Sequence, residues 1–286
     1  MGFQLNRGIY AQDLFELLKV KFDFPINSLI TNISPYVSAN QNSLTFLTAE
    51  TDYKKMCGIC FSKENDPDNG FVLVDNPRDL FAQALLVLKS ENLISDVHPH
   101  FISPKAIISP TASIDFGVQI ADDVVIEDFV SVKSGTIIGE GTLIRSFTCV
   151  GSEGFGIAKS ADGNNIRFLH LGGVKIGKYC EIGLFNSINC GTLSDTIIGD
   201  YVKTDAHVHI AHNCTIGNNS ILTAAAVLSG GVSIGDNVWL GPNSSIIQKT
   251  SIGSDSLIGI GAVVTKNIDS NVIAAGNPSK ILRSNK

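Results

Sequence analysis

The sequence is poor in charged residues and has no basic cluster. Only 17% of its 286 residues are charged, whereas about 25% is usual in soluble domains. It has 21 Lys and Arg residues and 27 Asp and Glu residues, which gives a net charge of −6. No basic run is longer than Lys54-Lys55. Because neutralising a nucleic-acid backbone requires clustered cations, this composition argues against a nucleic-acid partner. The 44% of hydrophobic residues excludes a disordered chain.

Long hydrophobic runs are also missing. No stretch of about 18 uninterrupted apolar residues exists, so we expect no membrane span. The N-terminus shows no basic segment followed by an apolar core, so we expect no secretory signal. The six cysteines are scattered through the chain, which predicts reduced thiols in the cytoplasm.

One cysteine pair has the spacing of a redox or zinc site. Cys57 and Cys60 are separated by two residues, but no second pair completes a tetrahedral zinc site. The pair also lies in an apolar run from Met56 to Phe61, which is typical of a buried strand. We therefore interpret both residues as structural thiols.

What the sequence does have is an aliphatic residue at every sixth position. The repeat runs without a break from Ile102 to Val150, resumes from Ile176 to Ile188, shifts by four residues, and continues from Ile198 to Val264 with only Thr204 out of pattern. A period of six fits neither an α-helix nor a simple amphipathic strand. It predicts a parallel β-helix whose three sides hold six residues each.

This geometry fixes a vertical register. Three sides make a coil of 18 residues, so Ile198, Ile216, Ile234 and Ile252 should stack above one another. With strands about 4.8 Å apart, roughly eight coils would stand about 40 Å tall. Two interruptions break the prism: a long loop over residues 151–174, which we expect to be functional, and a smaller bulge near Thr192 to Asp195.

The hexads divide the chain into three parts. Residues 1–97 carry no repeat and predict a small α/β domain, with a helix near 12–18 behind an Asp13 cap, strands near 43–47 and 70–74, and a second helix opened by Asn76-Pro77. Residues 98–268 form the predicted β-helix domain, with the inserted loop 151–174. Residues 269–286 are predicted to be a C-terminal tail.

The hexads identify the chain as a member of the hexapeptide-repeat proteins, which are mostly acyltransferases. It resembles most the family of UDP-3-O-acylglucosamine N-acyltransferases of lipid A synthesis, and the resemblance rests on residues 43–46, 76–77, 150–156, 191–199 and 210–213. It implies a mainly β fold with a left-handed parallel β-helix, a homotrimer and an N-terminal nucleotide-binding domain.

The chain also departs from that family. Asn189-Cys190 stands where the family has Asp-Arg, Gln248-Lys249 stands near the place of its second histidine, and its C-terminal helices, which are associated with carrier-protein docking, are absent. The segment from Ala275 to Leu282 is similar to the terminus of sugar acetyltransferases that use acetyl-CoA. We therefore expect transfer of an acyl group, most simply acetyl, from acyl-CoA to the amino group of a UDP- or dTDP-linked amino sugar in cell-surface polysaccharide or lipopolysaccharide synthesis.

Two other functions stay open. One is the lipid A enzyme itself, with acyl carrier protein as donor. The other is a zinc enzyme similar to trimeric γ-class carbonic anhydrases, because His207 and His212 have a matching separation. That reading lacks a third ligand, since His170 lies only in the inserted loop. His209 alternates with inward residues, so we expect it at the surface. We expect no bound metal or cofactor, with acyl-CoA as a co-substrate.

The resemblance places the chemistry at one corner of the prism. Amide formation from a thioester needs a base and a donor for the oxyanion. His212 matches the family's base, and Asn213 is a candidate for orienting substrate. The position one coil above His212 is Gly230 (212 + 18), whose N–H is a candidate oxyanion donor. The alternatives are a surface histidine and a glycine that only turns the corner.

Two further groups are candidates for substrate binding. Phe46 and Tyr53 match the aromatic residues on which the family stacks uracil, although core packing explains Phe46 equally well. Lys266, Lys280 and Arg283 are candidates for binding an anionic acyl donor, with solvated terminal charges as the alternative.

Overall fold

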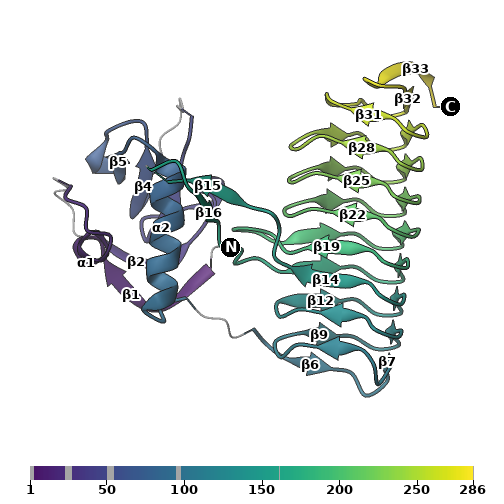
Figure 1. The fold of residues 1–286 in the computed structure, drawn as a ribbon, viewed down its shortest axis with the longest axis horizontal. Helices are drawn as coiled ribbons and strands as arrows, with labels where there is room; N and C mark the ends of the chain where they lie inside the picture. The colour runs from purple at the N-terminus through teal and green to yellow at the C-terminus, as the bar shows by residue number, and fades with distance from the viewer. Residues whose placement is uncertain (1–2, 23–27, 50–54, 95–97, 161, 286) are drawn as a thin grey trace. The chain divides into compact units, whose positions relative to one another are not determined.

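The protein folds into two compact units. The computed structural model describes residues 3–22, 28–49, 55–94, 98–160 and 162–285. The first unit combines Met1–Asp96 with Gly156–Leu171, and the second combines Val97–Phe155 with Gly172–Lys286 (Figure 1). Among the described helices, none is both long enough and apolar enough to span a bilayer.

The first unit is built on a five-stranded sheet in the order β1-β2-β3-β4-β5. Its strands are β1 (Phe3–Tyr10), β2 (Leu29–Ile33), β3 (Ser43–Phe46), β4 (Ile59–Ser62) and β5 (Phe71–Leu73), and its helices are α1 (Ala11–Leu17), α2 (Pro77–Ser90) and the short 3₁₀ turns Tyr36–Ser38 and Pro67–Asn69. β1 is antiparallel to β2, and the remaining pairs are parallel. The α/β expectation for this part is confirmed.

The two helices begin differently. α2 starts as expected, because the Asn76 side chain accepts a hydrogen bond from the Asp79 N–H at 3.2 Å and Pro77 fills the first helical position. The expected Asp13 cap is wrong: α1 continues directly from β1, its N-cap is Tyr10, and Asp13 lies inside the first turn. The Ala11 N–H is satisfied instead by the Ser28 carbonyl at 2.9 Å.

The paired cysteines are buried in the core of this unit. Cys60 lies in β4 and Cys57 just before it, and both are less than 5% exposed. Burial raises the pKa of the Cys57 thiol to about 11 and that of Cys60 further. All six cysteines are free thiols, so the interpretation of this pair as structural fits its surroundings.

The long insert does not form an open loop. It makes an antiparallel hairpin of β15 (Ile157–Lys159) and β16 (Asn165–Arg167), and residues 156–171 belong to the first unit. Phe168 is buried with its ring stacked 5.8 Å from Phe81 of α2, and the Lys159 carbonyl accepts a hydrogen bond from the Asn76 amide at 3.1 Å. The insert therefore completes the core of the N-terminal unit.

The second unit is the parallel β-helix that the hexads predict. Figure 1 shows its coils stacked from β6 to β33, and its strands form three sheets, which we call sides 1, 2 and 3. Side 1 holds β6 (Phe101–Ile102), β9 (Gln119–Ile120), β12 (Thr136–Ile138), β17 (Val174–Ile176), β20 (Thr196–Ile198), β23 (Thr215–Ile216), β26 (Ser233–Ile234) and β29 (Ser251–Ile252). Side 2 holds β7 (Ile107–Ile108), β10 (Val125–Ile126), β13 (Leu143–Ile144), β18 (Glu181–Ile182), β21 (Lys203–Thr204), β24 (Ile221–Leu222), β27 (Trp239–Leu240), β30 (Leu257–Ile258), β32 (Val272–Ala275) and β33 (Lys280–Ser284). Side 3 holds β8 (Ser113–Ile114), β11 (Ser131–Val132), β14 (Cys149–Ser152), β19 (Ser187–Asn189), β22 (His209–Ile210), β25 (Val227–Leu228), β28 (Ser245–Ile246) and β31 (Val263–Val264).

Residues 18 apart stack as expected. Ile198 pairs with Ile216, Ile216 with Ile234, and Ile234 with Ile252, and all four side chains are buried in one continuous core. Thr204, the one break in the second run of hexads, is also buried, and its hydroxyl accepts a hydrogen bond from the Gly183 N–H at 2.9 Å. A polar side chain is tolerated there because its oxygen is satisfied.

The glycine that often follows the inward aliphatic is required by the next coil. A Cβ on Gly217 would lie 2.5 Å from the carbonyl carbon of Gly235, so only glycine allows the two backbones to approach this closely. Polar side chains at the same corner form hydrogen bonds between successive coils. The Asn218 side chain accepts a hydrogen bond from the Asp200 N–H at 2.8 Å, and the Asp236 side chain accepts one from the Asn218 N–H at 2.6 Å.

The C-terminal segment is part of the prism and not the tail we expected. β32 adds to side 2 in parallel with β30, with Ala274 opposite Ile258, and β33 folds back antiparallel on β32. Ala274 is fully buried. The segment 272–284 therefore covers the last coil, which would otherwise leave its core open to water.

The close packing of coils predicts the effect of one added methyl group. Gly217→Ala should lower the free energy of unfolding by about 1–3 kcal/mol, because the new Cβ overpacks against backbone. Ser233→Ala, at an exposed position of β26, is the matched control and should change stability by less than about 0.5 kcal/mol. Urea denaturation of both variants measures the difference, and equal midpoints would contradict the packing argument.

Candidate active site

The candidate catalytic residues lie at one corner of the β-helix, where each coil passes from side 3 into side 1 of the next coil; we call it corner 3. Ile210, Leu228, Ile246 and Val264 are in register on side 3. The residues two positions after each of them occupy the same place in successive coils, namely His212, Gly230, Gln248 and Lys266. With coils about 4.8 Å apart, Lys266 lies about 14 Å from His212 along this corner.

The tautomer of the neutral His212 ring is set by its neighbour Asn213. His212 Nδ1 lies 2.9 Å from Asn213 Oδ1. That atom must be the amide oxygen, because it also accepts the Thr192 backbone N–H at 3.2 Å, while Asn213 Nδ2 donates to the Ser194 carbonyl at 3.1 Å. An oxygen cannot donate, so the proton of the neutral ring sits on Nδ1 and the basic lone pair on Nε2.

Gly230 lies directly against the His212 ring. A Cβ on Gly230 would come within 2.6 Å of His212 Cε1 and 2.8 Å of Nε2. The Gly230 carbonyl accepts the Lys249 N–H at 3.0 Å, whereas no acceptor in the part of the chain that the structure describes takes the Gly230 N–H. The corner thus brings the His212 ring and the Gly230 backbone, which belong to adjacent coils, next to each other.

His209 is not the surface histidine that its alternation with inward residues predicts. It is half-buried on β22, and its Nδ1 lies 2.8 Å from the Ser187 hydroxyl one coil below. Burial, and then repulsion from His212, lower the pKa of His209. The sequence could not show this, because the burial comes from neighbouring coils on side 3.

His207 does not join His212. It lies at corner 2, between sides 2 and 3, where its ring stacks 5.1 Å from that of Phe185. Within the described ranges no group of three or more His, Cys, Asp or Glu side chains could hold a metal ion. The two histidines of the zinc-enzyme alternative therefore project from different corners and share no site within one chain.

The aromatic candidates belong to the first unit. The Phe46 ring is partly buried and packs against Phe81 at 4.7 Å and Phe168 at 6.1 Å. It therefore serves the core of its unit, and its role as a platform for a base stays a prediction. Tyr53 lies outside the described residues.

The three basic candidates lie on two different segments near the C-terminal end of the β-helix. Lys266 shares corner 3 with His212, whereas Lys280 and Arg283 are exposed on β33, which belongs to side 2. Only Lys266 is thus tied to the candidate site by register. Lys249, which was not among the predicted site residues, lies at the same corner one coil above Gly231, and its Cγ would be 3.7 Å from a Cβ placed there.

Thr192 and Ser194 contact the Asn213 side chain, and the sequence did not predict either residue as part of the site. Their hydroxyls lie 2.9 Å from Asn213 Oδ1 and Nδ2, respectively. The signal was present, because the four-residue shift of the hexads comes one coil before His212. What could not be read from it was which atoms the bulge would present.

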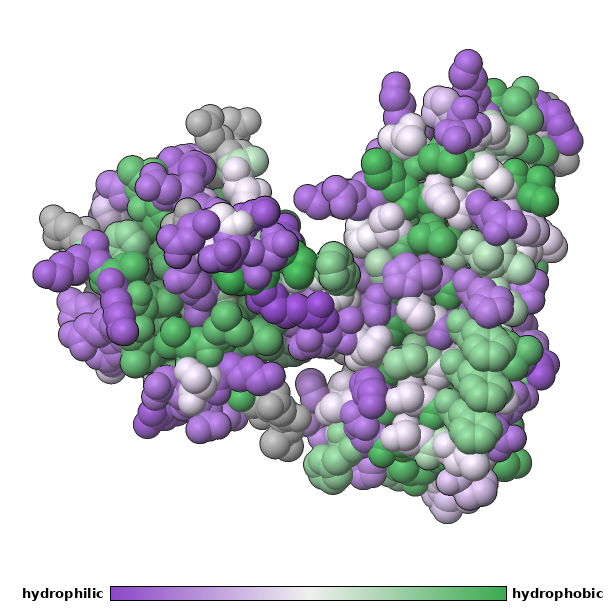
Figure 2. Space-filling model, viewed as in Figure 1, coloured by the Kyte–Doolittle hydropathy of each residue, from purple (hydrophilic) through white to green (hydrophobic). Residues whose placement is uncertain are grey.

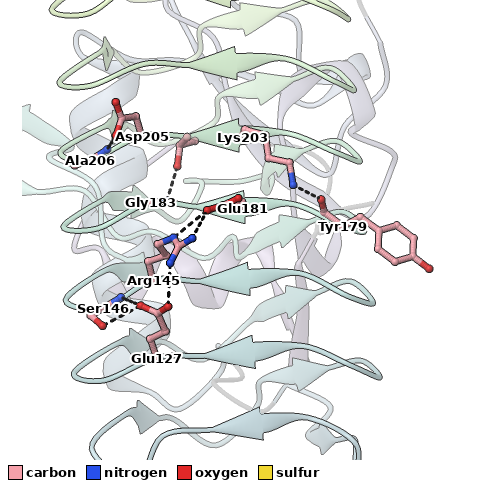
Figure 3. A network of polar contacts seen from close by, with 10 residues as sticks. Glu127, Arg145, Ser146, Tyr179, Glu181, Gly183, Lys203, Asp205 and Ala206 are labelled. Atoms are coloured by element: carbon pink, nitrogen blue, oxygen red, sulfur yellow. Dashed lines mark hydrogen bonds and ion pairs between the residues drawn. The ribbon is translucent and has the colours of Figure 1, made fainter.

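The densest charged network lies elsewhere, on side 2 (Figure 3). Arg145 donates from Nε and Nη2 to Glu181 at 2.9 and 2.6 Å and from Nη1 to Glu127 at 3.3 Å, and Glu127 also accepts from the Ser146 N–H at 2.9 Å. These groups neutralise one another across three coils. They are partly exposed, so each ion pair contributes at most about 1 kcal/mol, and we assign them a structural role.

The lowered pKa of His209 predicts a dependence of stability on pH. Between about pH 6.5, the ordinary histidine value, and its lower value in the folded state, the unfolded chain binds more protons than the native protein at this position. Stability is therefore lost as the pH falls through this window. His209→Gln should lose less free energy of unfolding than the wild type between pH 6.5 and 5 in urea titrations. Parallel pH curves for the two proteins would refute the assignment.

Comparison with known proteins agrees with this architecture. A model of the bacterial transferase hexapeptide (six repeats) matches residues 195–230 and 231–266. A UDP-3-O-acylglucosamine N-acyltransferase from Campylobacter lari is 33% identical over 276 residues, covering 87% of this chain and 86% of that protein. One from Campylobacter curvus is 32% identical over 126 residues, covering 44% of this chain and only 40% of that protein.

Solved structures show the same fold. A UDP-N-acetylglucosamine acyltransferase from Campylobacter jejuni superposes with a TM-score of 0.52 at 32% identity, over 62% of this chain and 75% of that one. Its counterpart from Bacteroides fragilis gives a TM-score of 0.50 at 26% identity, over 65% and 75%. The β-helix is thus left-handed, against the usual right-handed crossover rule. The C. lari match, at 87% of the chain, includes residues of both units.

Proposed function

The chain belongs to the UDP-3-O-acylglucosamine N-acyltransferase family, and on this premise we propose that it transfers an acyl group from a thioester to the amino group of a UDP-linked 3-O-acylglucosamine. The observation that carries the proposal is the juxtaposition at corner 3 of a histidine with its basic lone pair on Nε2 and the backbone of Gly230, whose N–H donates to no acceptor among the described residues. A base and an oxyanion donor at one point are what aminolysis of a thioester requires.

This acceptor replaces our first expectation of a UDP- or dTDP-amino sugar acetylated from acetyl-CoA. That expectation rested on the departures from the family and on residues 275–282. The structure explains residues 275–282 by the fold: they form the end of β32, a turn and the start of β33, and so close the last coil. The family alignment covers 87% of the chain and outweighs so short a similarity. The alternative that we left open, the lipid A enzyme, is the better supported.

The mechanism follows from the two groups. The neutral amine of the acceptor attacks the thioester carbonyl, and His212 Nε2 takes the proton that the amine loses. The Nδ1–H···Oδ1 bond to Asn213 stabilises the imidazolium that results. The Gly230 N–H donates to the oxyanion, and such a donor is worth roughly 2.7–4 kcal/mol. Collapse of the intermediate expels the thiolate, which recovers the proton from His212.

The remaining assignments concern substrate binding. The alignment and the partly buried aromatic cluster around Phe46 support a uracil site in the first unit that would use Phe46 and Tyr53. Lys266 supports an anionic donor approaching corner 3 from the C-terminal end. We take the donor to be acyl carrier protein, with acyl-CoA as the alternative. Six unpaired cysteines support a reducing compartment, the cytoplasm.

A homotrimer is part of the same proposal. Phe129, Phe147, Phe185 and His207 form a column of stacked rings at corner 2, with centroids 5.0, 4.9 and 5.1 Å apart, and the phenylalanines are each about half exposed. Figure 2 shows apolar side chains stacked along one edge of the β-helix. An exposed apolar column of this kind supports burial against a second copy of the chain.

Turnover tests the proposed reaction. The wild type should acylate UDP-3-O-acylglucosamine, and His212→Gln should lower kcat by about 10²–10⁴-fold, because general base catalysis contributes that much. Each protein is assayed with acyl carrier protein and CoA thioesters, and with UDP- and dTDP-amino sugars that lack the 3-O-acyl chain. Circular dichroism confirms that the variant is folded. Equal kcat in the variant, or turnover of only the unacylated sugars, would overturn the assignment.

The assembly is tested separately. Phe147→Ser should lower the molar mass measured by light scattering at low micromolar concentration, because it removes apolar surface buried between copies. Tyr201→Ser is the matched control, since Tyr201 is also about half exposed and stacks on Tyr179, but at corner 1. A monomeric wild type, or equal masses for both variants, would contradict the interface.

A further inference from the structure

The bulge between β19 and β20 lengthens the coil directly below the proposed base. Ser187 and His209 are paired across 22 residues, whereas His209 and Val227 are paired across the regular 18. We propose that this bulge, Gly191–Asp195, is a clamp for the catalytic base, with Thr192 and Ser194 as positioning residues that act through Asn213. The inference rests on the proposed role of His212.

The bulge makes Asn213 different from its equivalents in later coils. Asn213 Oδ1 accepts from the Thr192 N–H at 3.2 Å and from its hydroxyl at 2.9 Å, and Nδ2 donates to the Ser194 carbonyl at 3.1 Å and hydroxyl at 2.9 Å. The same corner position is Gly231 one coil above and Lys249 two coils above. Neither offers an amide to the residue before it.

These contacts give the amide one orientation. Turning it over would set Nδ2 against the Thr192 N–H and Oδ1 against the Ser194 carbonyl, which are two repulsive pairs in place of two hydrogen bonds. Oδ1 therefore always faces His212 Nδ1. In the opposite tautomer the proton would occupy Nε2, and the ring could not take the proton of the attacking amine there.

The clamp is itself anchored to the coil below. Asp195 Oδ1 accepts the Gly173 N–H at 2.9 Å, and Oδ2 pairs with Lys175 Nζ at 2.6 Å. Burial raises the pKa of Asp195, but Lys175, the Gly173 N–H and the charge of His98 outweigh burial and hold that pKa below its usual value. The carboxylate thus stays ionised and fixes the end of the bulge.

Glycine is needed where the bulge begins. The Gly172 N–H donates to the Gly191 carbonyl at 3.0 Å, and a Cβ on Gly191 would collide with the Ser194 carbonyl oxygen. The turn is therefore tight enough to bring the residues on either side of Leu193 to the same amide. An extension of four residues with no such closure would not present two hydroxyls and a carbonyl to one side chain.

The test reads the tautomer of His212 directly, without turnover. In protein labelled with ¹⁵N-histidine, the neutral wild-type ring should show a protonated Nδ1 and an unprotonated Nε2. The double variant Thr192→Val, Ser194→Ala removes the two hydroxyl contacts to Asn213 and leaves the two backbone contacts. It should therefore shift both resonances part of the way toward a mixture of tautomers. It should also lower kcat by about 10–100-fold, the usual effect of removing a group that orients an active residue, with KM unchanged within about twofold.

Two variants guard against a purely structural effect. Thr192→Ser keeps the hydroxyl and should keep the wild-type tautomer and kcat. Thr215→Val makes the same change at an exposed position of β23, two residues beyond Asn213, and should also behave as wild type.

The two proposals fail differently. A wild-type ring protonated on Nε2, or a double variant with the wild-type tautomer and kcat, would overturn the clamp. A ring whose tautomer depends on Thr192 and Ser194 in a protein that does not acylate UDP-3-O-acylglucosamine would support the clamp and overturn the proposed reaction.

Discussion

The close approach of one coil to the next is the constraint on which the rest of the β-helix depends. At Gly217, which follows an inward aliphatic residue of side 1, the backbones meet so tightly that only glycine fits. Corner side chains such as Asn218 then take up the N–H groups of the coil below. Because each coil is hydrogen-bonded in register to the next, a residue's neighbours are set by the coil length, and any change of that length has local chemical consequences.

The candidate site is such a consequence. His212 and Gly230 belong to different coils, and the regular 18-residue step between them places the Gly230 backbone next to the imidazole. The irregular 22-residue step below His212 does the opposite: it releases a bulge from the register and turns its polar groups onto Asn213. The regular 18-residue step brings His212 and Gly230 together. The irregular 22-residue step orients Asn213, which in turn contacts His212, the candidate base.

Elsewhere the same stacking has structural effects. On side 2 the stacking places Arg145 between Glu127 and Glu181, with which it forms ion pairs. At corner 2 it aligns aromatic rings into a column. In a β-helix, residues 18 apart in the sequence are stacked in successive coils, so similar side chains at that spacing form a continuous row on the surface. Charge and aromaticity therefore gather on particular sides and corners of this unit.

Much of the fold could be predicted because the hexads are local and repeated. They gave the β-helix, its register and the position of His212 at a corner, and the Asn76-Pro77 pair gave the start of α2. The prediction failed where packing between distant segments decides. Asp13 does not cap α1, because the chain enters that helix straight from β1. The segment after 269 is no tail, because the last coil needs cover. His209 is half-buried by neighbouring coils.

By itself, then, the sequence determined the period, and the period determined which residues stack, including His212 and Gly230. Only the tertiary structure decided which ring nitrogen carries the proton and which unit the insert joins. The reason is physical: periodic burial is encoded at every sixth residue, whereas the hydrogen bonds of Asn213 with Thr192 and Ser194 join side chains 21 and 19 residues apart, respectively, across a break in that period. Similarly, the hairpin of β15 and β16 joins the first unit through Phe168 and Asn76, whose partners are far away in the chain.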